Sequence, residues 1–165
     1  MSDSNALLPD LSFLPGIKAR LDRIDDLEAL RDLKALYARR VDDNHRAPTP
    51  QSATAAADLF TNDAILDLGP GSRYEGRAQI LNAFQNLFPA ATAWSTHYIV
   101  NPLLQVNGNT ATGTWYFLLY TQPKTSPPSP VLTLWGHYAE KYVKTNAGWK
   151  FKEVNGIVSL PVTTP

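Results

Sequence analysis

The stretch "STHYIVNPLLQVNGNTATGTWYFLLYTQ", residues 95–122, decides the fold, because it has the pattern of two long strands joined by a tight turn. Apolar residues alternate or run together on both sides of "NGNT", and an Asn-Gly pair at this place is typical of a β-hairpin. The same pattern continues to the end of the chain, with a second tight turn at "TNAG". Strands are therefore predicted over 94–106, 110–122, 131–145 and 148–160. The connection "PKTSPPSP" is rich in proline, which predicts an exposed loop.

The part of the chain that precedes this hairpin is helical in pattern. Apolar residues recur at helical spacing from Ile17 to near Asn44, which predicts a long amphipathic helix. Two shorter helices are predicted over 52–60 and 77–88, the second stopped by Pro89. Between them, "TNDAILDLG" indicates a short strand, and "GPGSRYEG" indicates a turn-rich loop.

Helices followed by a long antiparallel meander define an α+β class. We expect a cone-shaped barrel, in which a strongly curved, mostly antiparallel sheet wraps around the long N-terminal helix and leaves a ligand cavity. The expected organisation is an arm over residues 1–16, one domain over 17–161 and a tail over 162–165. Pro9, Pro15 and Gly16 are the reason for the arm.

Composition excludes several classes of function. Fifteen basic residues balance fifteen acidic ones, so we expect neither a nucleic-acid nor a membrane partner. The absence of cysteine excludes disulfides, thiolate metal sites and a cysteine nucleophile. The three histidines lie on unrelated segments, so no metal site is predicted. Without a signal-like or membrane-spanning stretch, we expect a cytoplasmic protein.

His97 is the one residue of the first long strand whose chemistry stands out, because it lies among apolar neighbours. It is either a structural histidine or the base of an active site. Side chains alternate along a strand, so a cavity-facing His97 predicts that Ser95, Ile99 and Asn101 face the cavity too. The other predicted lining residues, from the short strand and the later strands, are Leu66, Leu68, Trp115, Phe117, Leu119, Leu134, Tyr138 and Asn155. Such an apolar pocket favours a hydrophobic, cyclic ligand.

A histidine base needs a carboxylate that fixes its tautomer and stabilises its charged form. Asp42 and Asp43, near the end of the long helix, are the two candidates, and we favour Asp42. A carboxylate near a helix C-terminus opposes the helix dipole, so Asp42 requires a compensating partner. Tyr37 lies about 140° from Asp42 around a helix of 3.6 residues per turn, and both residues can border a wide cavity.

Four segments, read in order, resemble SnoaL-like proteins of the nuclear transport factor 2-like superfamily. They are "LKALYARRVDD", "LFTNDAILDLGPGSRYEGRAQI", "STHYIVNPLLQVNGNTATGTW" and "GHYAEKYVKTNAGWKFKEVNG". Within that superfamily they are most similar to the branch that contains scytalone dehydratase, bile-acid 7α-dehydratase and hexachlorocyclohexane dehydrochlorinase.

The resemblance implies a cone-shaped α+β barrel, often trimeric, that works without metal or organic cofactor. It implies that a His–Asp dyad, His97 with Asp42, removes a proton while a leaving group departs. Tyr37 matches a position that contacts the leaving group, and Asn155 matches a polar position on the last strand. Val154 stands where relatives carry an arginine that assists the leaving group, and a second tyrosine is missing from the first strand.

The predicted function is a cofactor-independent lyase acting on a polyketide, terpenoid or steroid-like molecule. An isomerase or cyclase with the same dyad is one alternative, and a non-catalytic ligand-binding or assembly domain is another. An epoxide hydrolase is disfavoured, because no arginine follows residue 77. The opposite face of the sheet, which carries Tyr98, Val100 and Tyr116, is rich in apolar groups and predicts a dimer or trimer formed through the sheet.

Overall fold

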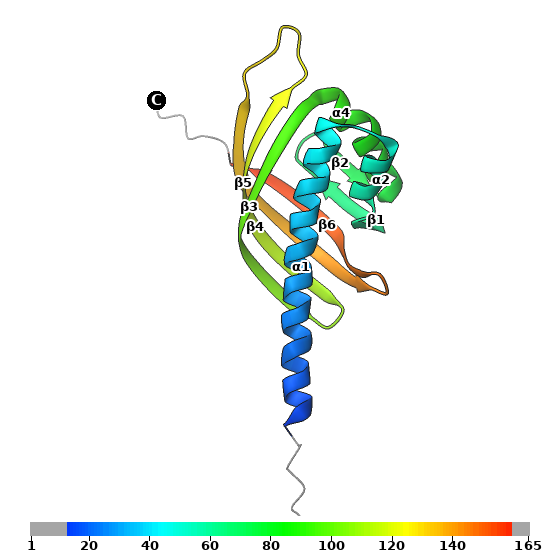
Figure 1. Cartoon of the computed structure of the whole chain (residues 1–165), viewed down its shortest axis with the longest axis vertical. Helices are drawn as coiled ribbons and strands as arrows, with labels where there is room; N and C mark the ends of the chain where they lie inside the picture. Colours follow the sequence, from blue (N-terminus) through cyan, green and yellow to red (C-terminus); the bar gives the residue numbers. More distant parts are fainter. Residues whose placement is uncertain (1–12, 160–165) are drawn as a thin grey trace, which may run out of the picture.

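The computed structural model describes residues 13–159, in which one long helix packs against a curved sheet of six strands (Figure 1). The predicted tail and most of the predicted arm, residues 1–12, lie outside this described part. The expectation of an α+β protein built on a long N-terminal helix is confirmed.

Helix α1 extends over Leu14–Arg46 and presents one apolar stripe, which includes Leu30, Tyr37 and Val41, to the sheet. It begins three residues before the predicted start at Ile17. Pro15 does not prevent this, because a proline in the first helical turn lacks only an N–H that would have no helical partner. No helix in the described part of the chain combines the length and apolar character needed to cross a membrane.

A group of short elements follows α1. Their bounds are α2 Pro50–Ala57, β1 Phe60–Asp67, β2 Arg73–Glu75, α3 Arg77–Asn82, the π-helical segment η1 Ala83–Leu87 and α4 Phe88–Ala91. Thr49 caps α2 through reciprocal hydrogen bonds with Ser52. The predicted turn-rich loop contains strand β2, which was not expected. Its residue Tyr74 pairs with Leu66 of β1, because the edge of β1 offers an unpaired backbone ladder.

The helix that was predicted to stop at Pro89 continues to Ala91, so this prediction was wrong. The N–H of Phe88 bonds to the carbonyl of Ala83, five residues earlier, and this widens the helix just before the proline. Pro89 therefore falls in the first turn of α4, where its missing N–H costs no helical hydrogen bond.

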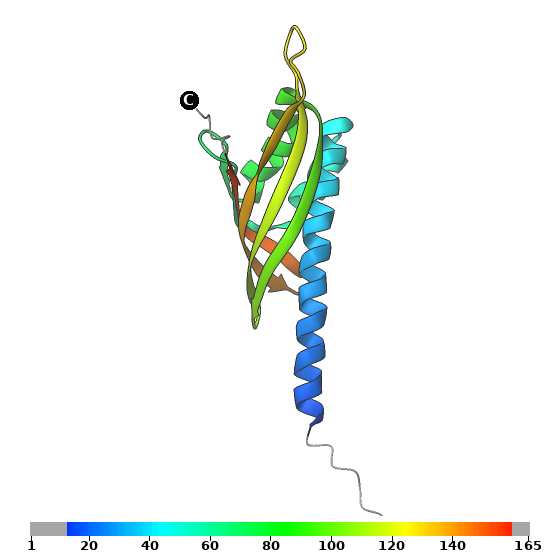
Figure 2. The same ribbon diagram turned by 90° about the vertical axis from the view of Figure 1, so that its left-hand side faces the viewer.

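The four predicted strands of the meander are present, with bounds that agree within two residues. They are β3 Thr92–Asn107, β4 Thr110–Pro123, β5 Leu132–Thr145 and β6 Gly148–Val158. The strand order is β2-β1-β6-β5-β4-β3, and only β1 and β6 are parallel. The sheet is curved but not closed, so the cone is open, with β2 and β3 as its edges (Figure 2).

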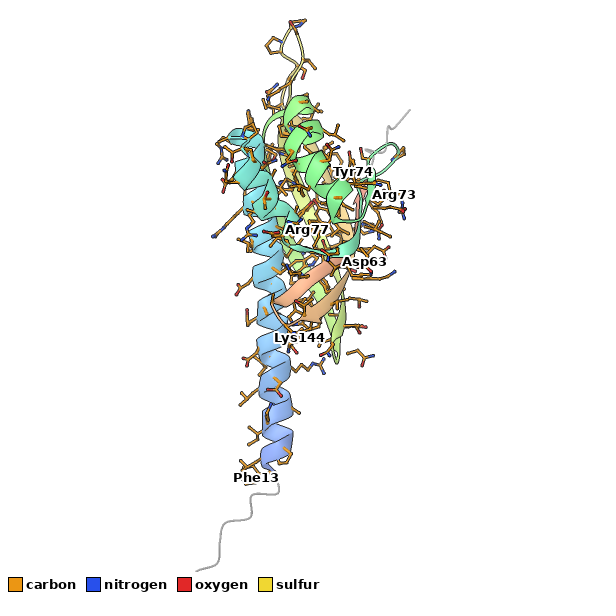
Figure 3. The ribbon with its side chains drawn as sticks, turned by 90° about the vertical axis from the view of Figure 1, so that its right-hand side faces the viewer. Phe13, Asp63, Arg73, Tyr74, Arg77 and Lys144 are labelled. Carbon is orange, nitrogen blue, oxygen red and sulfur yellow. The ribbon has the colours of Figure 1, made fainter. Side chains whose placement is uncertain are left out.

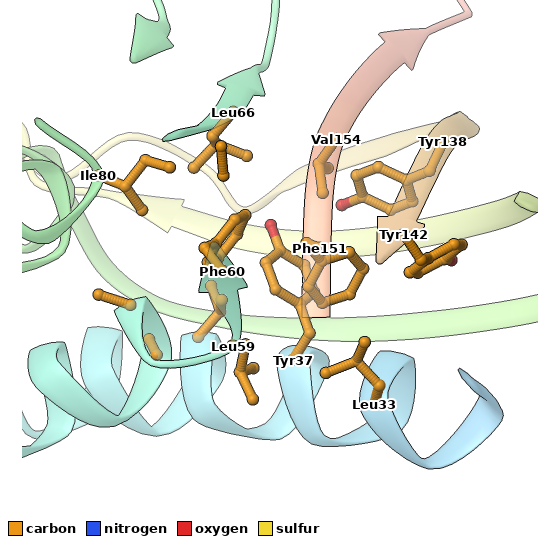
Figure 4. Close-up of a cluster of buried hydrophobic side chains, with 14 of the residues drawn as sticks. Leu33, Tyr37, Leu59, Phe60, Leu66, Ile80, Tyr138, Tyr142, Phe151 and Val154 are labelled. Atoms are coloured by element: carbon orange, nitrogen blue, oxygen red, sulfur yellow. The ribbon is translucent and has the colours of Figure 1, made fainter. Parts of the chain in front are cut away.

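The core lies between α1 and the concave face of the sheet (Figure 4). Aromatic rings meet edge-on there, as at Tyr37 and Phe151, whose centroids are 5.4 Å apart. A buried ion pair is enclosed in the same core, with Lys34 Nζ 2.5 Å from Glu140 Oε1. Glu140 Oε2 accepts a further hydrogen bond from the hydroxyl of Tyr142, so both carboxylate oxygens are paired.

The convex face of the sheet carries exposed apolar side chains, as the strand parity predicted for Tyr98, Val100 and Tyr116. Trp135 and Ile157 extend this exposed set onto β5 and β6. Residues on this face cannot reach the cavity, because successive side chains of a strand point to opposite faces.

Candidate active site

A cavity of about 340 Å³ lies between the C-terminal half of α1 and the concave face of the sheet. Helical segments η1 and α4 and the β1–β2 connection complete its wall. Its lining residues are Tyr37, Val41, His45, Leu68, Ser72, Phe84, Phe88, Thr92, Ser95, His97, Phe117, Leu119, Thr121, Leu134, Tyr138, Gly156 and Val158. Most of these side chains are apolar, and the polar groups come mainly from α1 and β3.

His97 is held at this wall by two contacts with Asp42. Strand β3 is an edge strand, so a backbone N–H on its outer side has no strand partner. The N–H of His97 instead donates to Asp42 Oδ2 at 2.9 Å, and the ring nitrogen Nδ1 lies 2.6 Å from Asp42 Oδ1. One carboxylate thus fixes both the backbone and the ring of His97.

Asp42 also accepts a hydrogen bond from Ser95 Oγ, at 2.5 Å from Oδ1. Burial acts to raise the pKa of Asp42, but the hydrogen bonds from His97 and Ser95 outweigh it and hold this pKa below its usual value. These donors compensate the unfavourable position of Asp42 near the helix C-terminus. The other candidate, Asp43, is exposed and pairs with Arg46 at 3.3 Å.

The hydrogen-bond directions determine the tautomers of two histidines. An ionised carboxylate can only accept, so His97 donates to Asp42 from Nδ1, and in the neutral ring the lone pair is then on Nε2, on the opposite side of the ring. The hydroxyl of Ser95 donates its one proton to Asp42. In the 2.7 Å contact between His45 Nδ1 and Ser95 Oγ, the donor must therefore be His45. The chain of contacts is therefore His45, Ser95, Asp42 and His97.

His45 is a member of the site that the sequence interpretation missed. Burial, with the nearby His97 as a further cause, lowers the pKa of His45 to about 4. The imidazole is therefore neutral at pH 7, and its Nε2 is buried without a hydrogen-bond partner in the described residues. The sequence did contain a signal for His45, because this residue follows Asp42 by three positions. Residues three apart lie on the same face of a helix.

Tyr37 and Tyr138 face each other at the inner end of the cavity, with ring centroids 6.3 Å apart. Burial, together with the charges of Glu140 and Asp42, raises the pKa of Tyr37, and burial likewise raises the pKa of Tyr138. Both phenols therefore keep their protons at neutral pH and can donate hydrogen bonds. The ammonium of Lys34 lies 3.5 Å from the centroid of the Tyr138 ring, a cation–π contact.

The structure brings most of the predicted site residues together. Those that line the cavity are Tyr37, Leu68, Ser95, His97, Phe117, Leu119, Leu134 and Tyr138. Leu66, Ile99 and Trp115 lie on the concave side but do not line the cavity, because they pack into the core instead. The indole of Trp115, for example, donates to the hydroxyl of Tyr142 at 2.9 Å.

Two predicted lining residues lie elsewhere. Asn101 is exposed, because a bulge interrupts the β3–β4 register after Val100 and ends the simple alternation of side chains. Its φ of 53° is left-handed, a conformation that asparagine tolerates. Asn155 faces the convex side, since its neighbour Gly156 lines the cavity, and its amide donates to Glu153 at 2.9 Å.

Several lining residues were not predicted. Phe84 and Phe88 come from the helical segments η1 and α4, Thr92 is the first residue of β3, and Gly156 and Val158 come from β6. The alternation of side chains along β6 predicts that Gly156 and Val158 share one face of the strand. Only the pairing of β6 with β5 decides that this face lines the cavity. Within residues 13–159, no cluster of three or more histidine or acidic side chains is arranged to hold a metal ion.

A comparison with family models matches residues 22–155 to the SnoaL-like domain. A candidate aromatic ring hydroxylase from Novosphingobium aromaticivorans is 30% identical, with a TM-score of 0.71, and the match covers 84% of this chain and 92% of that one. A comparison with curated proteins gave no match.

Two further structures share the fold at lower identity. A candidate scytalone dehydratase from Novosphingobium aromaticivorans is 19% identical, with a TM-score of 0.73 over 84% of this chain and 87% of that one. A hexachlorocyclohexane dehydrochlorinase from Novosphingobium barchaimii is 20% identical, with a TM-score of 0.73 over 86% and 91%. The long helix, the open mixed sheet and the matched segment lead to one conclusion: this chain belongs to the SnoaL-like domain family and has the nuclear transport factor 2-like cone fold.

Proposed function

We propose that the protein is a lyase that removes a proton from a hydrophobic cyclic molecule, with His97 as general base and Asp42 as its partner. The observation that carries this proposal is the 2.6 Å contact between His97 Nδ1 and Asp42 Oδ1 at the wall of an apolar cavity. A carboxylate on Nδ1 leaves Nε2 as the proton acceptor and stabilises the imidazolium that forms.

The cavity supports the choice of substrate class. Eight of the seventeen lining residues are leucine, phenylalanine or valine, and no lysine or arginine of the described residues lines the cavity. A phosphate or a strongly anionic sugar would lose its hydration there without gaining a cationic partner. A compact cyclic compound, such as a polyketide or terpenoid, would instead bury apolar surface against these side chains.

In the proposed reaction, His97 Nε2 takes a proton from a carbon next to a carbonyl. The electron pair of that C–H bond forms a carbon–carbon double bond while the bond to a neighbouring hydroxyl breaks. The hydroxyl oxygen takes the proton back from the imidazolium and leaves as water, so His97 ends the cycle neutral. Tyr37 and Tyr138, kept protonated by burial, would donate hydrogen bonds to the carbonyl oxygen as negative charge develops on it.

Two of the structural neighbours carry names of elimination enzymes, a candidate scytalone dehydratase and a hexachlorocyclohexane dehydrochlorinase. Their likeness supports a small-molecule enzyme of this kind. At 19% and 20% identity it does not extend to their substrates.

An isomerase is the second candidate, and one feature of the cavity favours it. No cationic lysine or arginine of the described residues stands on the wall to assist a leaving anion. An enolate held by Tyr37 and Tyr138 would then be reprotonated by His97 at another carbon, and no group would leave.

The test incubates the protein in D₂O with a panel of cyclic β-hydroxy ketones and follows each compound by mass spectrometry. Loss of water indicates elimination, whereas a chromatographically distinct product that has not lost water indicates isomerisation. We expect His97→Gln and Asp42→Asn to lower either rate about 10²–10⁴-fold, as is typical of general-base catalysis. His137→Gln, on the convex face, is the matched control. Unchanged rates in His97→Gln and Asp42→Asn would exclude the proposed base.

A further inference from the structure

The N-terminal part of α1 continues well past the end of the sheet, and no other helix or strand of residues 13–159 lies beside it there (Figures 1 and 2). Four large apolar side chains in this part are exposed, Leu14 at 46%, Ile17 at 45%, Leu21 at 54% and Ile24 at 54%. Figure 3 shows the side chains of these turns, from Phe13 onward, standing clear of the strands. We call these four residues the outer stripe.

The outer stripe lies on the side of α1 that faces away from the sheet. An α-helix turns about 100° per residue, so Leu21 projects nearly opposite to Leu30 and Tyr37, which are buried against the sheet. The apolar residues therefore move from one face of the helix to the opposite face between Ile24 and Leu30. The sheet of the same molecule therefore cannot cover the outer stripe.

The spacing of the outer stripe alternates between three and four residues, which is the pattern of the a and d positions in a coiled coil. Leu14 and Leu21 occupy a positions, and Ile17 and Ile24 occupy d positions. The next two such positions are Glu28 and Arg31, which pair with each other and end the apolar seam. The seam thus covers two heptads.

We propose that the outer stripe packs against the outer stripe of a second copy of this chain in a short, parallel coiled coil. Leucine at a with isoleucine at d favours more than two helices, so a third or fourth copy can join the same seam. In a parallel pair, the g position of one helix faces the following e position of its partner. These positions are Arg20 and Asp25, so each helix would contribute one member to each of two opposite-charge pairs. Within residues 14–25 the one ion pair of the described structure joins Lys18 to Asp22, which leaves Arg20 and Asp25 available.

Charge also decides the orientation. An antiparallel pair with the same four apolar layers would bring Arg20 close to Arg20 of the second copy, and Lys18 close to Lys18 of the second copy. Like charges at these places oppose association. The parallel pair has no such conflict, and it keeps the two sheets apart, because each sheet lies on the side of its helix away from the seam.

This pairing is independent of the proposed catalytic function and of any association through the convex face of the sheet. Leu14, Ile17 and Leu21 precede residue 22, where the match to the family begins. The outer stripe therefore lies mostly outside the segment that the family shares. Two heptads are short for a coiled coil, so we expect the association to depend on protein concentration.

Disulfide cross-linking tests the proposal directly, since the chain contains no cysteine. Ile24→Cys places a thiol at a d position, where parallel helices bring the two copies close together. Arg23→Cys is the matched control, because residue 23 points toward the sheet side of the helix. We expect mild oxidation to convert most of Ile24→Cys, and little of Arg23→Cys, into a disulfide-linked dimer. Equal yields for the two variants would overturn the proposal.

Charge reversal in the Ile24→Cys background gives a second test. Arg20→Glu places a carboxylate against Asp25 of the second copy, and Asp25→Arg places a guanidinium against Arg20 of the second copy. Each variant alone should therefore lose most of the cross-linked dimer. An equimolar mixture of the two should regain it, because both pairs then have opposite charges. If the mixture shows no gain over the separate variants, the outer stripe is covered by something else, such as residues 1–12, and the proposal is wrong.

Discussion

The ring nitrogen Nδ1 of His97 lies 2.6 Å from Oδ1 of Asp42, although 55 positions separate the two residues in the chain. The contact joins the end of the long helix to the edge strand of the sheet. Two further hydrogen bonds hold Asp42 in place. Ser95 donates to the same carboxylate oxygen, and His45 donates to Ser95. The stability of this chain of contacts, and of the fold that holds it, can be measured without knowledge of the substrate.

Ser95→Ala removes the hydrogen bond to Asp42 and leaves the buried N–H of His45 without an acceptor. We expect the free energy of unfolding to fall by about 1–3 kcal/mol, the cost typical of an unsatisfied buried polar group. Urea denaturation followed by circular dichroism measures the change. Ser159→Ala, which alters an exposed serine hydroxyl, is the control. Equal stability of Ser95→Ala and wild type would show that the contact contributes nothing.

His45 should make the stability of the protein depend on pH between about 4 and 6.5. The folded state keeps this imidazole neutral, because its pKa is lowered from 6.5 to about 4. The unfolded chain takes up a proton below pH 6.5, so the free energy of unfolding decreases as the pH falls through this window. At 1.36 kcal/mol per pKa unit, protonation of His45 in the unfolded chain lowers the free energy of unfolding by roughly 3 kcal/mol across this window.

The matched variant for this prediction is His45→Asn, whose amide can still donate to Ser95 but does not titrate. Its free energy of unfolding should decrease much less than that of the wild type between pH 6.5 and pH 4. Parallel urea titrations at several pH values give the two slopes. Identical slopes would mean that another group produces the pH dependence.

The buried pair of Lys34 and Glu140 should show strong coupling in a double-mutant cycle. Lys34→Met leaves the carboxylate of Glu140 buried without its cation, which typically costs about 3–5 kcal/mol. The double variant Lys34→Met/Glu140→Gln removes both charges and should be less destabilised than the sum of the two single variants. Guanidinium denaturation of the four proteins provides the cycle. Additive effects would contradict a direct interaction.

Gly136 has no space for a side chain. A Cβ at this position would lie 2.0 Å from the carbonyl oxygen of Ile157, in the backbone of the neighbouring strand, so no side-chain rotation could relieve the overlap. We expect Gly136→Ala to lower the free energy of unfolding by about 1–3 kcal/mol or more. Gly16→Ala is the matched control, because nothing lies within 4 Å of its Cβ position. In the first turn of α1, alanine should be neutral or stabilising by up to about 1 kcal/mol. Thermal unfolding distinguishes these outcomes.

The strands of the meander and the long helix could be predicted because their signals are local. Alternation of side chains, Asn-Gly at the turn and proline in the loop act within a few residues. The same reasoning failed at Asn101 and Pro89, where a bulge and a π-helical turn changed the local register. A bulge and a π-helical turn each add one residue to a regular repeat, and the periodicity of the neighbouring residues does not show where that residue is added.

The residues of the site also divide into those that local alternation predicts and those that depend on strand pairing or tertiary contacts. Alternation along β3 correctly placed Ser95 and His97 on the cavity wall, because both precede the bulge. The face of Asn155 was assigned wrongly, because a register shift between Lys141 and Tyr142 in the β5–β6 hairpin puts Asn155 opposite Ala139 instead of Tyr138. His45 was missed because its role depends on the position of Ser95 across the gap between helix and strand.

The sequence by itself determined the α+β class, the strands of the sheet and the presence of a histidine on a cavity-facing strand. These features follow from the backbone geometry and the periodicity of neighbouring residues. Only the tertiary structure decided that Asp42, and not Asp43, meets His97, and that the outer stripe of α1 faces away from the sheet. The reason is that such relations depend on how the helix is rotated and docked on the sheet, which is set by the packing of residues distant in the chain.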